Sequence, residues 1–398
     1  MYRQRNNNFR KSSGFRRNNG FRRNNFARRT VRFFDPSHLV KSSQTIATIE
    51  KPYVATNTFE SLKINDLLKK NIISKGYKSP TPIQDQTIPH ILEGKDVIGV
   101  ANTGTGKTAA FLIPLIDAVS KDKNKKVIIV TPTRELAMQI REEFFDFARG
   151  MGIYCALIMG GASTYRQKQD LYRNPNFVIG TPGRLKDLIQ QKALNLSSFG
   201  IVVLDEVDQM VDIGFLPDIK YFISLLNNNR QSLFFSATVE AKVKDVISRF
   251  VKNPITVSVK KQDTLVNIKQ NIVRVVDKHK KIEQLHDLLN NKDFEKVLIF
   301  GRTKWGVQRL SDELVKRGFS AEAIHGDKRQ NQRQRSLDRF KRNHVKILLA
   351  TDVASRGLDI DNVSHVINYD PPESYEIYIH RIGRTGRLDK PGTAITFI

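Results

Sequence analysis

A glycine-rich segment from Ala101 to Thr108 has the residue types of a phosphate-binding loop. It follows the apolar run Val97–Val100 and precedes a helix-like stretch from Ala109 to Val119. A strand that ends in such a turn and continues as a helix directs several backbone N–H groups into one concavity, where the helix dipole also favours negative charge. Lys107 can reach the β- and γ-phosphates of a nucleotide there, and the Thr108 hydroxyl can bind Mg²⁺. The predicted loop residues are Ala101, Asn102, Thr103, Gly104, Thr105, Gly106, Lys107 and Thr108.

A second candidate group consists of the carboxylates Asp205, Glu206 and Asp208, which follow the apolar run Ile201–Leu204. In an open parallel sheet, ligands bind at the carboxyl ends of the strands. Asp205 can hold the Mg²⁺ that bridges the β- and γ-phosphates, and Glu206 can polarise the water that attacks the γ-phosphorus. The pairing predicts hydrolysis of Mg-ATP rather than phosphate transfer to a protein.

These two segments resemble the nucleotide-binding motifs of the DEAD-box family of ATP-dependent RNA helicases, and the resemblance extends from about Phe59 to the end of the chain. Phe59, Gly76–Tyr77 and Pro80–Gln84 resemble the adenine-reading motif of that family. By this resemblance Phe59 stacks on the adenine, Gln84 hydrogen-bonds to the edge of the base, and Tyr77 belongs to the same cofactor-binding motif.

The third residue of the motif that names the family is Val207 here, where the family has alanine. Both side chains are small and apolar, and neither does chemistry. We expect local packing to absorb the added methyl groups, at a cost of about 1–3 kcal/mol where it cannot. ATPase activity is therefore expected to survive this departure.

Further motifs imply coupling and catalytic roles. Ser236–Thr238 resembles the family's coupling motif, with the hydroxyls of Ser236 and Thr238 placed to bond Asp208, and His380 is implied in the same coupling. The resemblance also implies that Asp359 binds the ribose and that Arg356 helps to position the attacking water. Arg384 and Arg387 would act as arginine fingers that bring positive charge to the γ-phosphate when the two domains close. The residues implied in catalysis are thus Glu206, Lys107, Arg384, Arg387 and Arg356.

The remaining motifs resemble the family's contacts with the RNA backbone. In the first half of the chain each one follows a strand candidate, where backbone N–H groups and arginine side chains can receive phosphate oxygens. By resemblance the RNA-binding residues are Pro132, Thr133, Arg134, Gly160, Gly161, Thr181, Pro182, Gly183, Arg184, Arg302, Thr303, Gly326, Arg333 and Thr351. Such binding is expected to be largely independent of base sequence and to weaken steeply with salt.

The expected architecture is α/β. Short apolar runs alternate with amphipathic, helix-like segments in two blocks, residues 58–257 and 269–398, which predicts parallel sheets with helices on both faces. The resemblance identifies the blocks as an ATP-binding and a C-terminal RecA-like domain. The polar stretch 258–268 interrupts the alternation and is predicted to be a linker. The strand candidates are Val97–Val100, Val127–Val130, Phe177–Ile179, Ile201–Leu204, Leu233–Phe235, Val297–Phe300, Ala321–Ile324, Ile347–Ala350, His365–Asn368 and Ala394–Ile398.

The N-terminal segment 1–45 is predicted to be a disordered basic tail. Its first 34 residues contain no Asp or Glu, and they repeat a hexad that begins at Phe9, Phe15 and Phe21. Arginine attracts phosphate and phenylalanine can stack on unpaired bases, so the tail is expected to add RNA affinity. A solubilising leader remains an alternative, and a mitochondrial transit peptide is disfavoured because the tail has no apolar helical face.

Composition narrows the class of protein. The net charge of +26 over 398 residues favours nucleic acid as the partner, because a field of that sign concentrates polyanions. The single cysteine, Cys155, rules out an intrachain disulfide and is expected to be a buried thiol. No apolar run approaches the length of a membrane span. We expect a cytoplasmic monomer that acts on RNA, for example in ribosome assembly or RNA decay.

Two alternative functions remain open from the sequence. A DNA-directed helicase of the same superfamily is disfavoured by the adenine motif around Gln84, and stimulation of the ATPase by RNA or by DNA separates the two. A non-enzymatic role as an ATP-gated RNA clamp, or as an annealing chaperone driven by the basic tail, is the second alternative. Deletion of residues 1–40 distinguishes it, since loss of RNA remodelling with intact ATPase would favour the chaperone.

Overall fold

The computed structural model describes residues 53–102, 104–239, 241–259, 268–277, 280–291, 293–355, 360, 363–386 and 391–398. The predicted tail 1–45 lies outside these residues, as do Thr103, Arg356, Asp359 and Arg387. Among the described residues, no helix is both long and apolar enough to cross a bilayer.

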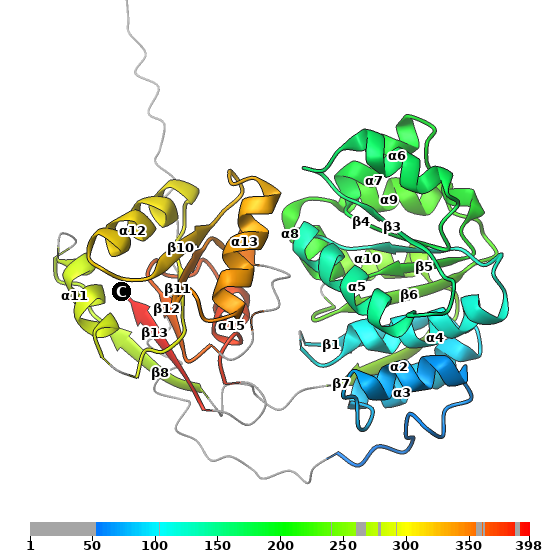
Figure 1. Cartoon of the computed structure of the whole chain (residues 1–398), viewed down its shortest axis with the longest axis horizontal. Coiled ribbons are helices and arrows are strands. Elements are labelled where there is room, and N and C mark those ends of the chain that lie inside the picture. The colour runs from blue at the N-terminus through cyan, green and yellow to red at the C-terminus, as the bar shows by residue number, and fades with distance from the viewer. Residues whose placement is uncertain are drawn as a thin grey trace, which may run out of the picture. The chain divides into compact units, whose positions relative to one another are not determined.

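The first domain is built on a seven-stranded sheet in the order β3-β4-β2-β5-β6-β1-β7, and every pairing between its strands is parallel. Helices cover both faces of this sheet (Figure 1). The strands are β1 (Val97–Ala101), β2 (Val127–Val130), β3 (Cys155–Ile158), β4 (Phe177–Gly180), β5 (Ile201–Leu204), β6 (Gln231–Ser236) and β7 (Ile255–Val259). The helices are α2 (Asp66–Ser74), α3 (Pro82–Leu92), α4 (Lys107–Lys121), α5 (Arg134–Phe147), α6 (Thr164–Tyr172), α7 (Pro182–Gln190), η1 (Leu196–Ser198), α8 (Val207–Ile213), α9 (Leu216–Leu225) and α10 (Ala241–Phe250).

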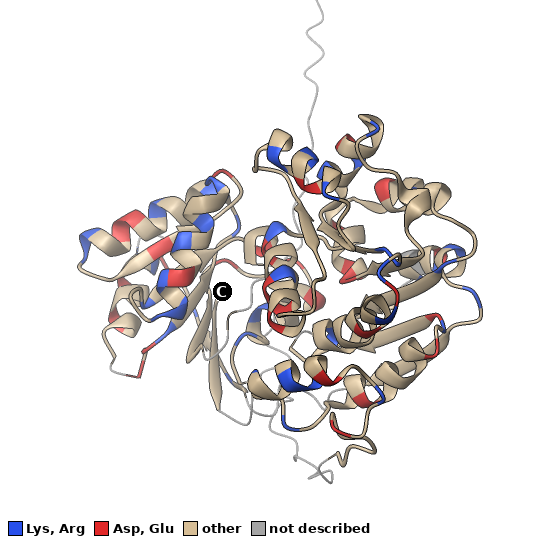
Figure 2. Cartoon of the chain, turned by 45° about the vertical axis from the view of Figure 1, so that its right-hand side comes forward, with Lys and Arg blue, Asp and Glu red and all other residues tan. Residues whose placement is uncertain are grey.

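The second domain repeats the plan with a six-stranded parallel sheet in the order β10-β11-β9-β12-β13-β8. Its strands are β8 (Ile268–Val273), β9 (Val297–Phe300), β10 (Ala321–Ile324), β11 (Ile347–Ala350), β12 (His365–Asn368) and β13 (Gly392–Phe397). Its helices are α11 (Lys281–Leu289), α12 (Lys304–Lys316), α13 (Gln330–Lys341), α14 (Asp352–Ser355) and α15 (Tyr375–Ile382). Figure 2 shows lysine and arginine positions, in blue, distributed over the helices of both domains.

Each sheet is buried on both faces, which explains why its central strands are continuous apolar runs rather than alternating ones. All four residues of β2, β4, β5, β9 and β11 are buried. The strand candidates read from such runs are therefore confirmed, with shifts of no more than three residues at their ends. The expected fold class, two parallel-sheet α/β domains, is also confirmed.

Three strands were not anticipated. In β3 two of the four residues are only half-buried, and β7 and β8 mix buried and exposed positions. Ser258 and Val259 pair with β1, and Ile268 pairs with Gly392, so these strands extend into the range 258–268 that the sequence predicts to be a linker. The apolar signal of β7 and β8 is weak because edge strands bury less surface than central ones. Strand β3 is also an edge strand, but it is an apolar run that was not among the strand candidates.

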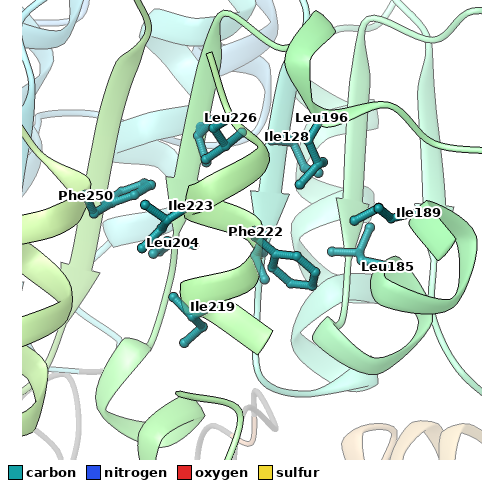
Figure 3. A pocket seen from close by; sticks show the side chains of 12 residues that line it. Ile128, Leu185, Ile189, Leu196, Leu204, Ile219, Phe222, Ile223, Leu226 and Phe250 are labelled. Carbon is teal, nitrogen blue, oxygen red and sulfur yellow. The ribbon is translucent and has the colours of Figure 1, made fainter. Parts of the chain in front are cut away.

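Helix α9 closes one face of the first sheet. Figure 3 shows Ile219 and Phe222 of this helix among the apolar side chains of neighbouring elements. The cavity between them measures only about 10 Å³ and is lined entirely by apolar side chains, so it is a dry packing gap and not a ligand site.

Candidate active site

The glycine-rich loop leaves β1 at Ala101 and enters α4 at Lys107. Gly104 and Gly106 have φ values of 78° and 91°, a region that favours glycine, and they allow the backbone to fold back on itself. No side chain caps the N-terminus of α4, which leaves its first N–H groups available to an anion. The Lys107 ammonium is buried and donates a hydrogen bond of 2.9 Å to the Ala101 carbonyl, while Thr108 lies half-buried next to it.

The predicted adenine motif is attached directly to this loop. The Gln84 side chain is fully buried, accepts a hydrogen bond from the Thr81 N–H at 3.0 Å and donates one to the Gly106 carbonyl at 3.1 Å. The Thr81 hydroxyl donates to the Thr105 carbonyl at 2.8 Å. The start of α3 and the loop therefore form one hydrogen-bonded unit.

Phe59, which is predicted to stack on adenine, is buried in this structure. Its side chain has no exposed surface, and its ring packs edge-on against Tyr77 with the centroids 5.9 Å apart. Tyr77 in turn packs edge-on against Phe147 and donates a hydrogen bond of 2.7 Å to Glu143. Phe59 thus belongs to the hydrophobic core of the first domain and packs against the half-buried Tyr77.

Asp205 and Glu206 lie where β5 ends, with both side chains almost wholly buried. Burial raises the pKa of Asp205 to about 6 and that of Glu206 to about 7, and the nearby Lys107 ammonium opposes both shifts. Glu206 has a φ of 52°, a conformation that costs a non-glycine residue about 1–3 kcal/mol. Among the described residues, its buried Oε2 atom has no hydrogen-bond partner. A charge-bearing group held in a strained, partly unsatisfied state is typical of a catalytic position.

The residues present therefore fit a nucleotide with a magnesium ion. The uncapped end of α4 can receive phosphate oxygens, and the unpartnered Glu206 oxygen can accept a proton from a water. The hydroxyl of Thr108 and the carboxylate of Asp205 are oxygen ligands of the kind that Mg²⁺ prefers.

The contact predicted between Asp208 and the segment Ser236–Thr238 is present. The Asp208 carboxylate accepts hydrogen bonds from the Thr238 hydroxyl at 3.3 Å and from the N–H groups of Ala237 and Thr238. The Ser236 hydroxyl bonds differently from the expectation, since it accepts from the Asp208 N–H at 3.4 Å and donates to the Thr238 carbonyl. These bonds join the segment that follows β5 to the end of β6.

The predicted RNA-binding residues of the first domain meet at the carboxyl ends of three neighbouring strands, β3, β4 and β2. The Arg134 guanidinium packs so closely on Gly160 and Gly161 that a Cβ added at either residue would lie 2.9 or 2.6 Å from its nitrogens. Arg184 donates a hydrogen bond of 3.1 Å to the Ala162 carbonyl. Four of the predicted residues are buried: Pro132, Thr133, Thr181 and Pro182.

The second domain shows the same arrangement at the carboxyl ends of β10, β11 and β9. Arg302 follows β9 and donates its N–H to Asp370 at 2.8 Å, while Thr303 caps α12 by accepting from the Gly306 N–H. Gly326 follows β10 and Thr351 follows β11. Arg333 lies in the first turns of α13, and His380 is half-buried on α15.

Sequence reasoning gave no role to Arg381, which is only 2% exposed. Its guanidinium donates to both carboxylate oxygens of Asp352, at 2.6 and 2.8 Å, to Asn368 Oδ1 at 3.2 Å and to the Asp370 carbonyl at 2.7 Å. This side chain joins the start of α14 and the end of β12 to α15, three residues before the buried Arg384. Arg381 lies in the same segment as Arg384 and Arg387, and nothing in the sequence distinguishes its structural role from the role predicted for those two arginines.

The chain is similar to known helicases over both domains. Residues 81–246 match the family model of the DEAD/DEAH box helicase, and residues 280–389 match that of the helicase conserved C-terminal domain. The chain is 44% identical over 344 residues to the DEAD-box ATP-dependent RNA helicase CshA of Bacillus subtilis, covering 86% of this chain and 70% of that protein. The ATP-dependent RNA helicase CshA of Limosilactobacillus reuteri is also 44% identical, over 85% of this chain and 69% of its own length.

Solved structures give the same result. The Dbp5 protein of S. cerevisiae, bound to RNA and ADP BeF3, is similar with a TM-score of 0.76 and 31% identity, over 86% of this chain and 89% of that chain. A DEAD box protein of Methanococcus jannaschii is 38% identical with a TM-score of 0.51, over 86% and 93% of the two chains. The chain therefore belongs to the DEAD-box family of ATP-dependent RNA helicases.

Proposed function

We propose that this protein hydrolyses Mg-ATP to bind, locally unwind and remodel RNA or RNA–protein complexes, with the residue roles set out below. The observation that carries the proposal is the Glu206 carboxylate, which is buried and strained beside the phosphate loop with one oxygen unpartnered among the described residues. Such an oxygen can hold an attacking water in line with a phosphate bound at the N-terminus of α4.

The roles at the nucleotide follow from this placement. Residues 101–106 bind phosphate oxygens through backbone N–H groups, and Lys107 moves from the Ala101 carbonyl to the β- and γ-phosphates. Thr108 and Asp205 hold the magnesium ion, which when bound offsets the charge that develops on the phosphates. Glu206 accepts a proton from the attacking water, whose oxygen bonds to the γ-phosphorus as the bond from the γ-phosphorus to the β-phosphate oxygen breaks, which leaves ADP and inorganic phosphate. Arg384, Arg387 and Arg356 supply positive charge and orientation, and Asp359 binds the ribose.

The roles at the RNA rest on the two sets of strand ends. Arg134, packed on Gly160 and Gly161, presents a cation beside the exposed backbone of Gly161. Phosphate oxygens can approach such glycines closely, and this type of contact carries no base information. We infer that both domains hold the RNA backbone through the listed residues, and that a bend imposed on one strand separates a nearby duplex. Asp208, with its bonds to the segment Ser236–Thr238, and His380 transmit hydrolysis to this surface.

The proposal includes a monomeric protein in the cytoplasm whose basic tail adds RNA affinity. Support for the role of the tail is its composition, with arginines that attract phosphate and phenylalanines that can stack on bases. Ribosome assembly and RNA decay are the settings in which such a general RNA remodeller would act.

The test is ATP hydrolysis with no nucleic acid, with single-stranded RNA and with DNA of the same sequence, using Glu206→Gln as the inactive reference. RNA alone is expected to stimulate the wild-type protein, and the variant is expected to lose about 10²-fold or more of the stimulated rate while it still binds ATP. Equal stimulation by DNA would favour a DNA-directed helicase. Unchanged hydrolysis in the variant would refute the role of Glu206.

A further inference from the structure

A basic segment, residues 341–346, joins α13 to β11 at the amino end of the second sheet. It reads Lys-Arg-Asn-His-Val-Lys and contains no acidic residue. Lys341, Arg342, His344 and Lys346 are all exposed, while Val345 between them is buried and fixes the segment to the core. The segment therefore presents several cations from an anchored backbone. All the predicted RNA-binding strand ends lie at the opposite, carboxyl edge of this sheet.

The surface is hollowed on both sides of this segment. On one side lies a hollow of about 940 Å³, which includes Lys341 and Lys346 in its lining together with the apolar residues Leu289 and Ile347. On the other side lies a hollow of about 390 Å³ along the exposed face of α13. The second hollow is lined by Asn331, Gln334, Arg335, Asp338, Arg339, Arg342 and His344. The basic segment contributes residues to both hollows: Lys341, Asn343, Val345 and Lys346 to the larger one, and Arg342 and His344 to the smaller one.

Aromatic rings line the larger hollow. Phe294 is half-buried and stacks on His365 with the ring centroids 3.9 Å apart, and Phe319 is half-buried and packs edge-on against His286 at 5.4 Å. Both rings also pack against the hydrophobic core of the second domain, which fixes their positions. A fixed, partly exposed aromatic ring in a basic groove is the arrangement on which unpaired bases stack.

The acidic residues in the lining do not cancel this positive charge. Asp338 and Glu295 are the two carboxylates in the lining, and the lysines and arginines there outnumber them. Asp338 accepts a hydrogen bond of 2.8 Å from Gln334. Three asparagine side chains in the larger hollow, of Asn290, Asn291 and Asn343, offer the paired donors and acceptors that base edges use. Cations, aromatic rings and amides together suit a single-stranded nucleic acid better than an acidic protein segment, which needs only the cations.

We propose that this concave surface, residues 341–346 with Phe294 and Phe319, is a second binding site for single-stranded RNA on the second domain. It would hold the part of a long RNA that extends beyond the two motif-bearing strand edges, with phosphates on Lys341, Arg342 and Lys346 and bases on the two rings. The proposal rests on the RNA helicase function and adds a site outside the helicase motifs. Binding at this site would keep a long RNA on the protein through repeated cycles of ATP hydrolysis.

The test compares two variants of the full chain that lose the same charge. One carries Lys341→Glu, Arg342→Glu and Lys346→Glu, and the control carries Lys63→Glu, Lys125→Glu and Lys192→Glu, at three exposed lysines of the first domain. Binding of fluorescent single-stranded RNA of about 10 and about 40 nucleotides is measured by anisotropy over a range of salt concentrations, since single-strand sites usually span about 4–16 nucleotides. ATP hydrolysis without RNA checks that both variants are folded.

For the long RNA, the first variant is expected to bind at least tenfold more weakly than wild type. The slope of log affinity against log salt should decrease in size by about 2, which corresponds to about 0.7 for each lost phosphate contact. The short RNA should bind both variants alike. A separate Phe319→Leu variant should bind the long RNA about fivefold more weakly with the salt slope unchanged, because stacking involves no counterion.

Three results would overturn the proposal. If the control triple variant loses the same affinity for the long RNA, the effect is due to overall charge and not to this surface. If the first variant loses the same affinity for the short RNA, the contact lies at the motif-bearing strand ends. If the first variant binds both RNA lengths with unchanged affinity, the surface does not bind RNA, and an acidic protein partner becomes the better explanation. Loss of RNA binding altogether, with RNA-independent hydrolysis also lost, would instead count against the proposed function of the enzyme.

Discussion

The ion pair between the buried Arg381 and Asp352 is expected to contribute strongly to the stability of the second domain, and the variant Arg381→Gln tests this expectation. The variant leaves the Asp352 carboxylate without both of its guanidinium bonds, and removes the donors to Asn368 and to the Asp370 carbonyl. Breaking a buried pair by removing one partner costs about 3–5 kcal/mol. The Asp352 side chain is 26% exposed, so water can partly solvate it, and the lower end, about 3 kcal/mol, is the expectation.

Hydrogen exchange measured by mass spectrometry resolves this loss by domain. Peptides from β11, β12 and α15 should exchange faster in Arg381→Gln, while peptides from the first domain serve as an internal reference. The same loss corresponds to a fall of about 10 °C in the melting temperature of the second domain. Arg309→Gln, at an exposed arginine of α12, is the matched control and should change stability by less than about 0.5 kcal/mol. If Arg381→Gln behaves like this control, the reasoning from burial and hydrogen bonds is wrong.

Three further variants test the nucleotide site. Gly106→Ala should abolish binding of a fluorescent ATP analogue, because φ is 91° and the added Cβ would lie 2.3 Å from Gln84 Nε2; normal binding would show that the loop can rearrange. Glu206→Gln should stabilise the nucleotide-free protein by about 1–3 kcal/mol at pH 8 in urea titrations, and this gain should vanish as the pH falls towards 4. The sign follows because burial raises the pKa of Glu206 to about 7, so the wild type loses stability as the pH rises through that value; a gain independent of pH would contradict it. Val207→Ala should retain RNA-stimulated hydrolysis but lower stability by about 1–3 kcal/mol, since Val207 is fully buried in the core; a large change in turnover instead would give this residue a role in chemistry.

Much of the fold could be predicted because the central strands of parallel sheets are uninterrupted apolar runs. Ile201–Leu204 and Ile347–Ala350 begin and end in the structure where the sequence placed them. Strand β7 was not predicted because an edge strand is covered less completely, so polar residues such as Ser258 occur in it. The local pattern of apolar residues indicates how deeply a strand is buried, and it indicates only indirectly which strands pair with each other.

The candidate site was predictable where its residues are adjacent in the sequence. The loop 101–108 and the carboxylates after β5 are of this kind, since a turn and its two flanking elements fix their geometry. The burial of Phe59 beneath Tyr77, and the bonds of Arg381 to Asp352 and Asn368, depend on packing between distant segments. Neither could be read from spacing alone, because the same residue types would serve equally well at a surface.

The most direct test of the account is strand separation of a short RNA duplex with a single-stranded extension, followed by the release of a labelled strand. The wild-type protein with Mg-ATP is expected to release the strand, and Glu206→Gln with Mg-ATP should bind the RNA but fail to sustain release over repeated cycles. Release at the same rate without ATP, or undiminished multiple-turnover release by Glu206→Gln, would contradict the claim that hydrolysis at Glu206 drives RNA unwinding.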